Sequence, residues 1–240
     1  MKSVLASVGI TLIFAVGCQG QMPPMPGTTP PAEIPAADPA GPKQRIAIIN
    51  VGGVDAAIME HCVTNLQAVF LTPLTVLPPQ EAVGADSLED ELPPLEKLKA
   101  EDTFCILAVI MGGEGNEKYV ATYPKRRIAF VNARTLKPAD GDETLYERRM
   151  KSETVRMVAY QMGIAPAPDP RCASHAYLND DGLNQKGTNL CPPYQADVFK
   201  IGARLNLQGH PIDREQYYRK LAEEWMEKNQ EQLQQQKKKR

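Results

Sequence analysis

The residue types that could do chemistry gather between positions 145 and 194, and the most informative of them share one predicted helix. Arg156 and Tyr160 lie four residues apart beside Met157, and Gly163 follows as the stop signal of that helix. Side chains four apart lie on the same face of a helix. A guanidinium on that face can hold a carboxylate through two parallel hydrogen bonds. This face of the predicted helix is therefore a candidate site for a carboxylate, such as a peptide C-terminus.

Other catalytic patterns are weak in this chain. The three histidines, His61, His175 and His210, are dispersed, and no two have the spacing that places two imidazoles on one helical face. We expect each to be an ordinary surface residue, with His175 the best placed to lie near the Arg156 face. No G-x-S-x-G segment indicates a serine nucleophile. The adjacent Gly52 and Gly53 are explained by a tight turn after a strand.

The order of the segments resembles that of the archaemetzincins, a zincin-type family of zinc metalloproteases. A strand IAFVNARTLKP precedes LYERRMK, a helix ending in glycine and then spaced cysteines. The family motif is H-E-x-x-H-x-x-G-x-x-H-C. With its glycine on Gly163, the three zinc histidines fall on Arg156, Tyr160 and Pro166, and the catalytic glutamate falls on Met157.

The residues at these motif positions cannot do the family's chemistry. Zinc needs lone pairs from its ligands, and the glutamate must accept a proton from the metal-bound water. Arginine keeps its proton near neutral pH and offers no lone pair, while methionine and proline have no group that titrates. The resemblance therefore implies a degenerate member with no catalytic residues and no zinc cofactor.

The family's second, structural zinc site is also incomplete by this resemblance. Its cysteine positions fall on Ala167, Cys172, Cys191 and Tyr194, and two thiols do not close a four-ligand shell. In an oxidising compartment the two remaining cysteines would pair. The resemblance thus implies a Cys172–Cys191 disulfide, which closes a loop of about 20 residues and contributes roughly 3 kcal/mol.

Two further cysteines occupy core positions of the predicted elements. Cys62 lies on the first helix and Cys105 on the central strand, and both should face the space between helix and sheet. A disulfide between them and two buried free thiols are both compatible with the sequence.

The remaining segments predict an α/β domain. Buried strands are expected at 45–51, 74–77, 104–111 and 128–132, with the third at the sheet centre, and a polar edge strand at 118–122. Helices are expected from a cap at Asp55 to residue 70, around 94–100, and from Asp142 or Thr144 to residue 162. With the family resemblance, the fold class is a zincin-like twisted mixed sheet. It is mostly parallel with one antiparallel edge strand, a long first helix and an active-site-type helix.

The first 42 residues read as a targeting signal and a tether. Residues 4–16 form an apolar run that closes on small residues before Cys18, as in a bacterial lipoprotein signal. An ordinary cleaved signal peptide is the alternative. Lipid on Cys18 would anchor an exported protein, and Gln19 favours the outer membrane facing the periplasm. The proline-rich residues 19–42 predict a disordered tether, before an archaemetzincin-like domain over residues 43–208.

Residues 209–240 are expected to form a C-terminal helix with a basic tail. Asp213 is a plausible cap, and Tyr217, Leu221 and Trp225 repeat every four residues, so we expect this stripe to dock on the domain or on a partner. With a net charge of −2 and 6% aromatic residues, the chain offers no footprint for nucleic acid.

Three functions remain open at this point. The first is a binding pseudo-protease that takes a peptide or protein ligand in a cleft lined by Arg156, Tyr160 and His175, with an extended peptide added to the edge strand. The second is a zinc-dependent metallopeptidase with ligands from positions outside the motif. The third is a structural envelope lipoprotein. Burial of Arg156 against an internal carboxylate would make its role structural.

Overall fold

The computed structural model describes residues 42–83, 87–113, 118–211, 213–223 and 226. The predicted signal, Cys18 and most of the tether lie outside these residues, as do Trp225 and the basic tail. Among the described residues, no helix has the length and apolar character needed to cross a bilayer.

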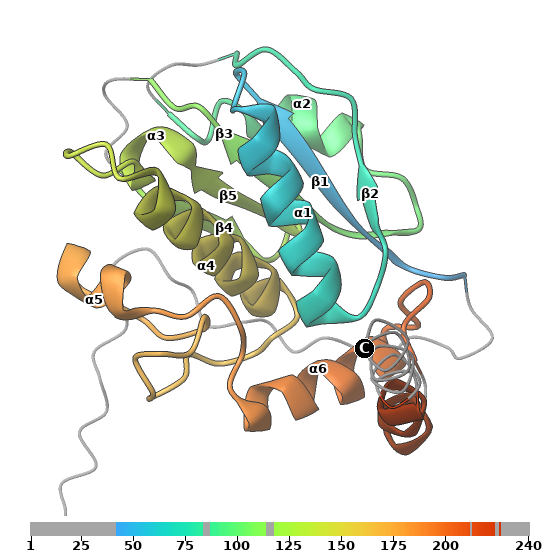
Figure 1. Cartoon of the computed structure of the whole chain (residues 1–240). Coiled ribbons are helices and arrows are strands. Elements are labelled where there is room, and N and C mark those ends of the chain that lie inside the picture. The colour runs from blue at the N-terminus through green and yellow to red at the C-terminus, as the bar shows by residue number, and fades with distance from the viewer. Residues whose placement is uncertain (1–41, 84–86, 114–117, 212, 224–225, 227–240) are drawn as a thin grey trace, which may run out of the picture.

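The domain is built on a five-stranded sheet with the order β2-β1-β3-β5-β4 (Figure 1). The strands are β1 (Arg45–Val51), β2 (Leu74–Val76), β3 (Thr103–Ile110), β4 (Val120–Tyr123) and β5 (Ile128–Asn132). All neighbouring pairs are parallel except β4 and β5, which are antiparallel. The predicted mixed sheet is therefore confirmed, with β3 at its centre and β4 at one edge.

Helices cover both faces of this sheet. They are α1 (Ala56–Phe70), α2 (Leu92–Lys97), α3 (Ala133–Leu136), α4 (Glu143–Gln161), α5 (Asp180–Gln185) and α6 (Pro192–Arg204). The strand residues alternate between two cores, as a period of two requires. Ile46 and Leu107 pack with α1 and α4, whereas Ala47 and Ile106 pack with α2.

The two long helices begin and end where the capping residues allow. The Asp55 side chain accepts hydrogen bonds from the main-chain nitrogens of Ala57 and Ile58, which confirms it as the cap of α1. Asp142, rather than Thr144, caps α4 by accepting from Leu145 N. Gly163 follows the end of α4 with φ +76°, a left-handed conformation that costs glycine little.

The chain beyond α4 contains elements that were not predicted. Helix α5 lies inside the loop that the predicted disulfide between Cys172 and Cys191 would close, and α6 follows this loop, starting with Pro192 and Pro193. Proline is accepted in the first turn of a helix, because its missing N–H has no intrahelical partner there. In Figure 1, α5 and the connection from α4 lie against the side of α4 that faces away from the sheet, and α6 lies by the C-terminal end of α1.

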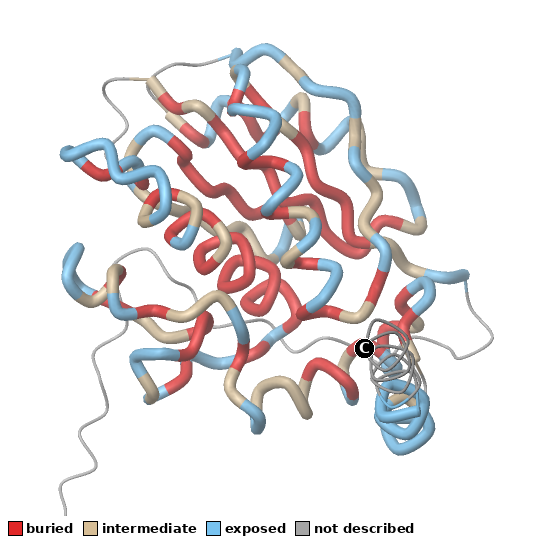
Figure 2. Tube along the Cα trace, in the orientation of Figure 1, coloured by how far each residue is buried: buried red, intermediate tan, exposed pale blue. Residues whose placement is uncertain are grey.

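The C-terminal half of α4 is buried all round, whereas its first residues reach the surface. Residues 152–162 are buried without interruption, and Figure 2 shows this run as one continuous red segment. One side of the helix packs on the sheet, and the other is covered by residues 164–190. The face predicted to line an open cleft therefore lies inside the domain.

The described part of the C-terminal helix packs on α6 near its beginning. Asp213 accepts hydrogen bonds from the nitrogens of Glu215 and Gln216, as its predicted role as a cap requires. The Tyr217 ring packs edge-on against Phe199 of α6, with centroids 5.6 Å apart. Leu221 is exposed and so does not dock on the domain, while Trp225 lies outside the described residues; docking of the stripe on a partner stays a prediction.

Candidate functional site

The outer face of α4 carries a buried ion cluster. Arg156 is 1% exposed, Glu153 is fully buried, and Lys186 reaches them from the segment after α5. Nε and Nη2 of Arg156 donate to Oε2 of Glu153 at 2.9 and 2.5 Å, and Lys186 Nζ donates to Oε1 at 2.5 Å. One carboxylate is thus shared by two cations from different parts of the chain.

Aromatic rings complete the surroundings of this cluster. The Tyr177 hydroxyl donates to Oε2 of Glu153 at 3.2 Å. The guanidinium carbon of Arg156 lies 4.8 Å from the Tyr177 ring centroid and 5.6 Å from that of Tyr160. Nη1 of Arg156 is buried without a hydrogen-bond partner in the described part of the chain, and these two ring faces are the attractive surfaces beside the guanidinium.

The electrostatics of the cluster follow from burial and from its excess of positive charge. Burial by itself would raise the pKa of Glu153, but Arg156 and Lys186 outweigh it and lower the pKa. Burial lowers the pKa of Lys186 to about 8, and repulsion from Arg156 acts in the same direction against the attraction of Glu153. The Glu153 carboxylate is therefore held ionised. Of the three charged groups, the Lys186 ammonium is the one that is least favourable to bury in its charged form.

Arg156 consequently meets the condition for a structural role. The carboxylate that it holds belongs to Glu153 of its own chain, one helical turn earlier, and not to a ligand. Tyr160 is also buried, under the same cover. The expectation of an open cleft at Arg156 and Tyr160 is therefore corrected: Tyr177 and Lys186 fill the space over this face.

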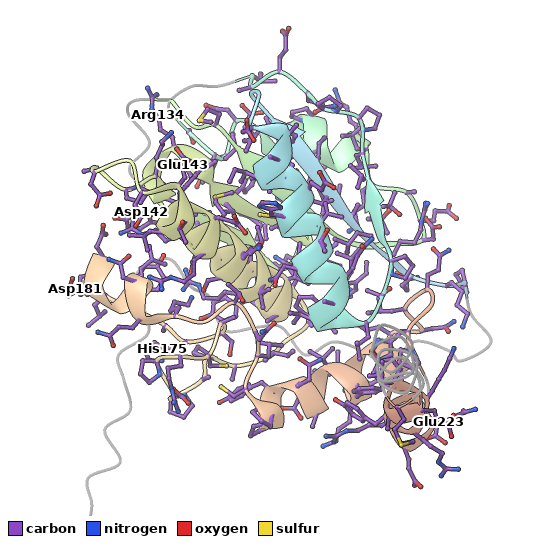
Figure 3. The ribbon with its side chains drawn as sticks, viewed as in Figure 1. Arg134, Asp142, Glu143, His175, Asp181 and Glu223 are labelled. Atoms are coloured by element: carbon purple, nitrogen blue, oxygen red, sulfur yellow. The ribbon has the colours of Figure 1, made fainter. Side chains whose placement is uncertain are left out.

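His175 lies apart from the cluster, on the connection between α4 and α5 (Figure 3). Its Nδ1 is 2.7 Å from the carbonyl oxygen of Ala167, and its main-chain nitrogen donates to Cys172 O. The side chain thus fastens the turn that follows α4. No contact joins it to Arg156 or Tyr160 among the described residues, so the predicted trio does not converge.

The other two histidines have different surroundings. His61 is exposed on α1 and pairs with Glu147, 3.1 Å away. His210 was expected at the surface, but it is buried, with Nδ1 3.1 Å from Phe70 O and Nε2 3.3 Å from Phe199 O. It joins the C-terminal end of α1 to α6. A single histidine far from any helical partner leaves no periodic signal from which such burial could be predicted.

The residues at the motif positions do not fit a zinc ion. Arg156 is a cation already paired with Glu153, Met157 is packed in the core, and the Pro166 ring carries no donor atom. Across the residues that the structure describes, no three His, Cys, Asp or Glu side chains are grouped so that they could hold a metal. The guanidinium stands at the position that the sequence resemblance assigns to the first zinc histidine.

The two cysteines beyond α4 lie next to each other as free thiols. The main-chain nitrogen of Cys191 donates to Sγ of Cys172 at 3.0 Å, and Ser174 Oγ lies 3.4 Å from the same sulfur. The disulfide predicted between Cys172 and Cys191 is not formed in this structure, although its partners are adjacent. Cys62 and Cys105 are also free thiols, both buried as expected.

Solved structures with a similar fold are zinc peptidases. The crystal structure of a zinc-dependent peptidase from Methanocorpusculum labreanum matches with a TM-score of 0.54 and 16% sequence identity, over 64% of this chain and 99% of that one. Archaemetzincin from Methanopyrus kandleri matches with a TM-score of 0.54 and 16% identity, over 66% of this chain and 95% of that one. No family model and no curated protein matches the sequence. The chain therefore has an archaemetzincin-like fold, in which a zincin-like mixed sheet supports the helix that carries Arg156.

Proposed function

We propose that this protein is an envelope lipoprotein whose archaemetzincin-like domain has no peptidase activity and serves in binding or as a structural element. The observation that carries the proposal is the Glu153–Arg156–Lys186 cluster on α4. Zinc peptidase chemistry needs an open metal position and a base beside it. A buried arginine with its own carboxylate partner supplies neither.

The cluster supports a structural role for this face of the domain. It ties α4 to the segment that carries Lys186, and it does so without a metal. A peptide ligand, if the protein has one, would have to use the free side of β4 rather than Arg156. Strand β4 is the last in the sheet order, and Gln161 Nε2 at the end of α4 holds it by donating to Thr122 Oγ1 at 2.7 Å.

The membrane part of the proposal comes from the sequence. The small residues before Cys18 favour lipidation at that cysteine, and Gln19 favours the outer membrane facing the periplasm. Replacing Cys18 by serine should move the protein from the detergent phase to the aqueous phase on phase separation. A protein that is cleaved after residue 18, so that Cys18 is lost, or whose partition is unchanged by the substitution, would overturn lipid anchoring. Neither result would change the interpretation of the ion cluster on α4.

Metal analysis of the purified full-length protein tests whether zinc binding and peptidase activity have been lost. After exchange into zinc-containing buffer and desalting, we expect far less than one equivalent of zinc per chain by elemental mass spectrometry. Protein incubated with a peptide library should leave it uncut, with and without a chelator. A tightly held equivalent of zinc, together with chelator-sensitive cleavage, would establish instead the alternative of a metallopeptidase with ligands outside the motif.

A further inference from the structure

The cysteine pair beyond α4 combines one buried and one accessible sulfur. Cys172 is 1% exposed, whereas Cys191 is only partly buried at the start of α6. The two are adjacent through the 3.0 Å hydrogen bond from Cys191 N to Cys172 Sγ. A reagent from solvent therefore meets Cys191 before it meets Cys172.

The surroundings of Cys172 are those of a sulfur that carries negative charge. Its Sγ accepts from the Cys191 amide and lies 3.4 Å from the Ser174 hydroxyl. The chain around it runs beside the residues that flank Lys186, because Gly187 N donates to Arg171 O at 2.9 Å and Ala173 N donates to Asn189 O at 2.9 Å. Gly187 permits this approach, since a Cβ there would lie 2.5 Å from Arg171 O. The buried cluster nearby holds two cations against one carboxylate.

These contacts give the two thiols different pKa values. Burial alone would raise the pKa of Cys172, but the hydrogen bonds from Cys191 and Ser174 outweigh it and lower the pKa. Burial and the neighbouring sulfur raise the pKa of Cys191 to about 12. Of the two, Cys172 is the better leaving group in thiol–disulfide exchange, because a thiol of lower pKa leaves faster.

We propose that Cys172 and Cys191 form an exchange-active disulfide that an external thiol opens at the Cys191 sulfur, with Cys172 as the leaving thiolate. The thiolate of the external thiol attacks Cys191 Sγ, the bond between the two protein sulfurs breaks, and its electron pair passes to Cys172 Sγ. A second external thiolate then attacks the mixed disulfide on Cys191 and releases this cysteine, which takes a proton from water. Two external thiols are oxidised to one disulfide while the protein disulfide is reduced to two thiols.

This inference does not rest on the proposed function, because it needs neither lipid at Cys18 nor the loss of zinc chemistry. It distinguishes the pair from an inert structural disulfide, which resists the glutathione pool. Ser174 is a positioning residue in this scheme, since it stabilises the leaving sulfur without touching the external thiol.

The test uses the full-length protein, oxidised and then equilibrated in buffers of reduced and oxidised glutathione. Acid quenching, alkylation and peptide mass mapping report each cysteine. We expect the Cys172–Cys191 disulfide to form in the buffers rich in oxidised glutathione and to be reduced in those rich in reduced glutathione. A pair that never forms a disulfide, or one that only dithiothreitol reduces, would overturn the proposal.

Single variants test which sulfur is attacked. With oxidised glutathione, the Cys172→Ser protein should accumulate a mixed disulfide on Cys191, whereas Cys172 in the Cys191→Ser protein should react at least about tenfold more slowly because access controls exchange. Cys62→Ser is the matched control at a buried cysteine outside the pair, and it should exchange like the wild type. Equal rates at the two sulfurs would contradict the assigned order.

Two further measurements keep the result independent of misfolding in these variants. When the oxidised wild type is treated with a limiting amount of glutathione and quenched with acid, the trapped glutathione should be on Cys191, with Cys172 as the free thiol. Ser174→Ala should slow reduction of the disulfide by glutathione several-fold, while its melting temperature in the oxidised form stays close to that of the wild type. Glutathione trapped on Cys172, or reduction of the alanine variant at the wild-type rate, would refute the role of Cys172 as the stabilised leaving group.

Discussion

Arg156 and Glu153 face each other within one turn of α4, with both Nε and Nη2 of the arginine on the same carboxylate oxygen. Neither side chain has appreciable contact with solvent. An ion pair in such a position stabilises a fold only while both partners are present, because a buried charge without its counter-ion is strongly unfavourable. The buried half of α4 therefore depends on an internal salt bridge.

The first prediction concerns the loss of the shared carboxylate. Glu153→Gln leaves Arg156 and Lys186 as buried cations without a counter-charge, and we expect the free energy of unfolding to fall by about 3–5 kcal/mol. Urea denaturation followed by circular dichroism measures the change. Glu147→Gln removes a carboxylate of the same helix that is 31% exposed and pairs with Lys151 and His61, and it should cost at most about 1 kcal/mol. A similar decrease in the free energy of unfolding in both variants would show that Glu153 contributes no more to stability than an exposed carboxylate of the same helix.

The second prediction concerns Lys186, the surplus cation. Lys186→Met keeps the Glu153–Arg156 pair and removes a charge that is costly to bury, so at pH 7 the variant should lie within about 1 kcal/mol of the wild type or exceed it in stability.

The difference in stability between the wild type and Lys186→Met should also depend on pH. Because the pKa of Lys186 is lowered from 10.5 to about 8, the folded state loses this proton before the unfolded state does. The unfolded state binds more protons between these two values, and the lysine's contribution to stability therefore rises with pH in that window. The stability of the wild type relative to Lys186→Met should increase from pH 7.5 to pH 9.5. A difference that stays constant or declines would show that Lys186 is not desolvated as the structure indicates.

The third prediction concerns His210, whose two ring nitrogens both face carbonyl oxygens. Burial lowers the pKa of His210 below its ordinary value of 6.5, although both carbonyls act in the opposite direction. The unfolded state then binds more protons at acidic pH, and stability is lost as the pH falls through 6.5. We expect a lower unfolding free energy at pH 5.5 than at pH 7.5. His210→Gln should reduce that difference, and an unaltered difference would assign the acid sensitivity to other groups.

The fourth prediction concerns the close approach of α6 to the same histidine. A Cβ at Gly202 would lie 2.6 Å from the His210 ring. Gly202→Ala should therefore destabilise the protein by about 1–3 kcal/mol through overpacking, even though alanine is favoured over glycine in a helix by about 1 kcal/mol.

Two further variants separate packing from helix propensity. Ala203→Gly, at an exposed position of the same helix, measures the propensity effect alone. Gly202→Ala combined with His210→Ala removes the clash, so the alanine at 202 should be tolerated better in that background than in the wild type. Strict additivity of the two substitutions in thermal unfolding would contradict the proposed contact.

Much of the sheet was predictable because its strands are buried on both faces. The apolar run around β3 is typical of a central parallel strand, and the weakly alternating run near β4 is typical of an edge. No element was predicted where α6 lies; this helix begins with Pro192 and Pro193, which are allowed in a first helical turn. For the cluster, the only local signal was the spacing of Glu153 and Arg156, which on most helices marks a solvent-exposed pair.

The sequence by itself determined which side chains stand at the positions that the family resemblance assigns to the motif: Arg156 and Met157 on α4, and Pro166 beyond its end. Their chemistry does not depend on where they point, because arginine offers no lone pair near neutral pH, methionine has no group that titrates and the proline side chain has no donor atom. Whether Arg156 meets a ligand or a partner of its own chain was decided only by the tertiary structure. Lys186 and Tyr177 approach Glu153 from 33 and 24 residues further along the chain, and no local pattern specifies such a contact. Only the packing of that segment over α4 removes water from the cluster and makes its charges depend on one another.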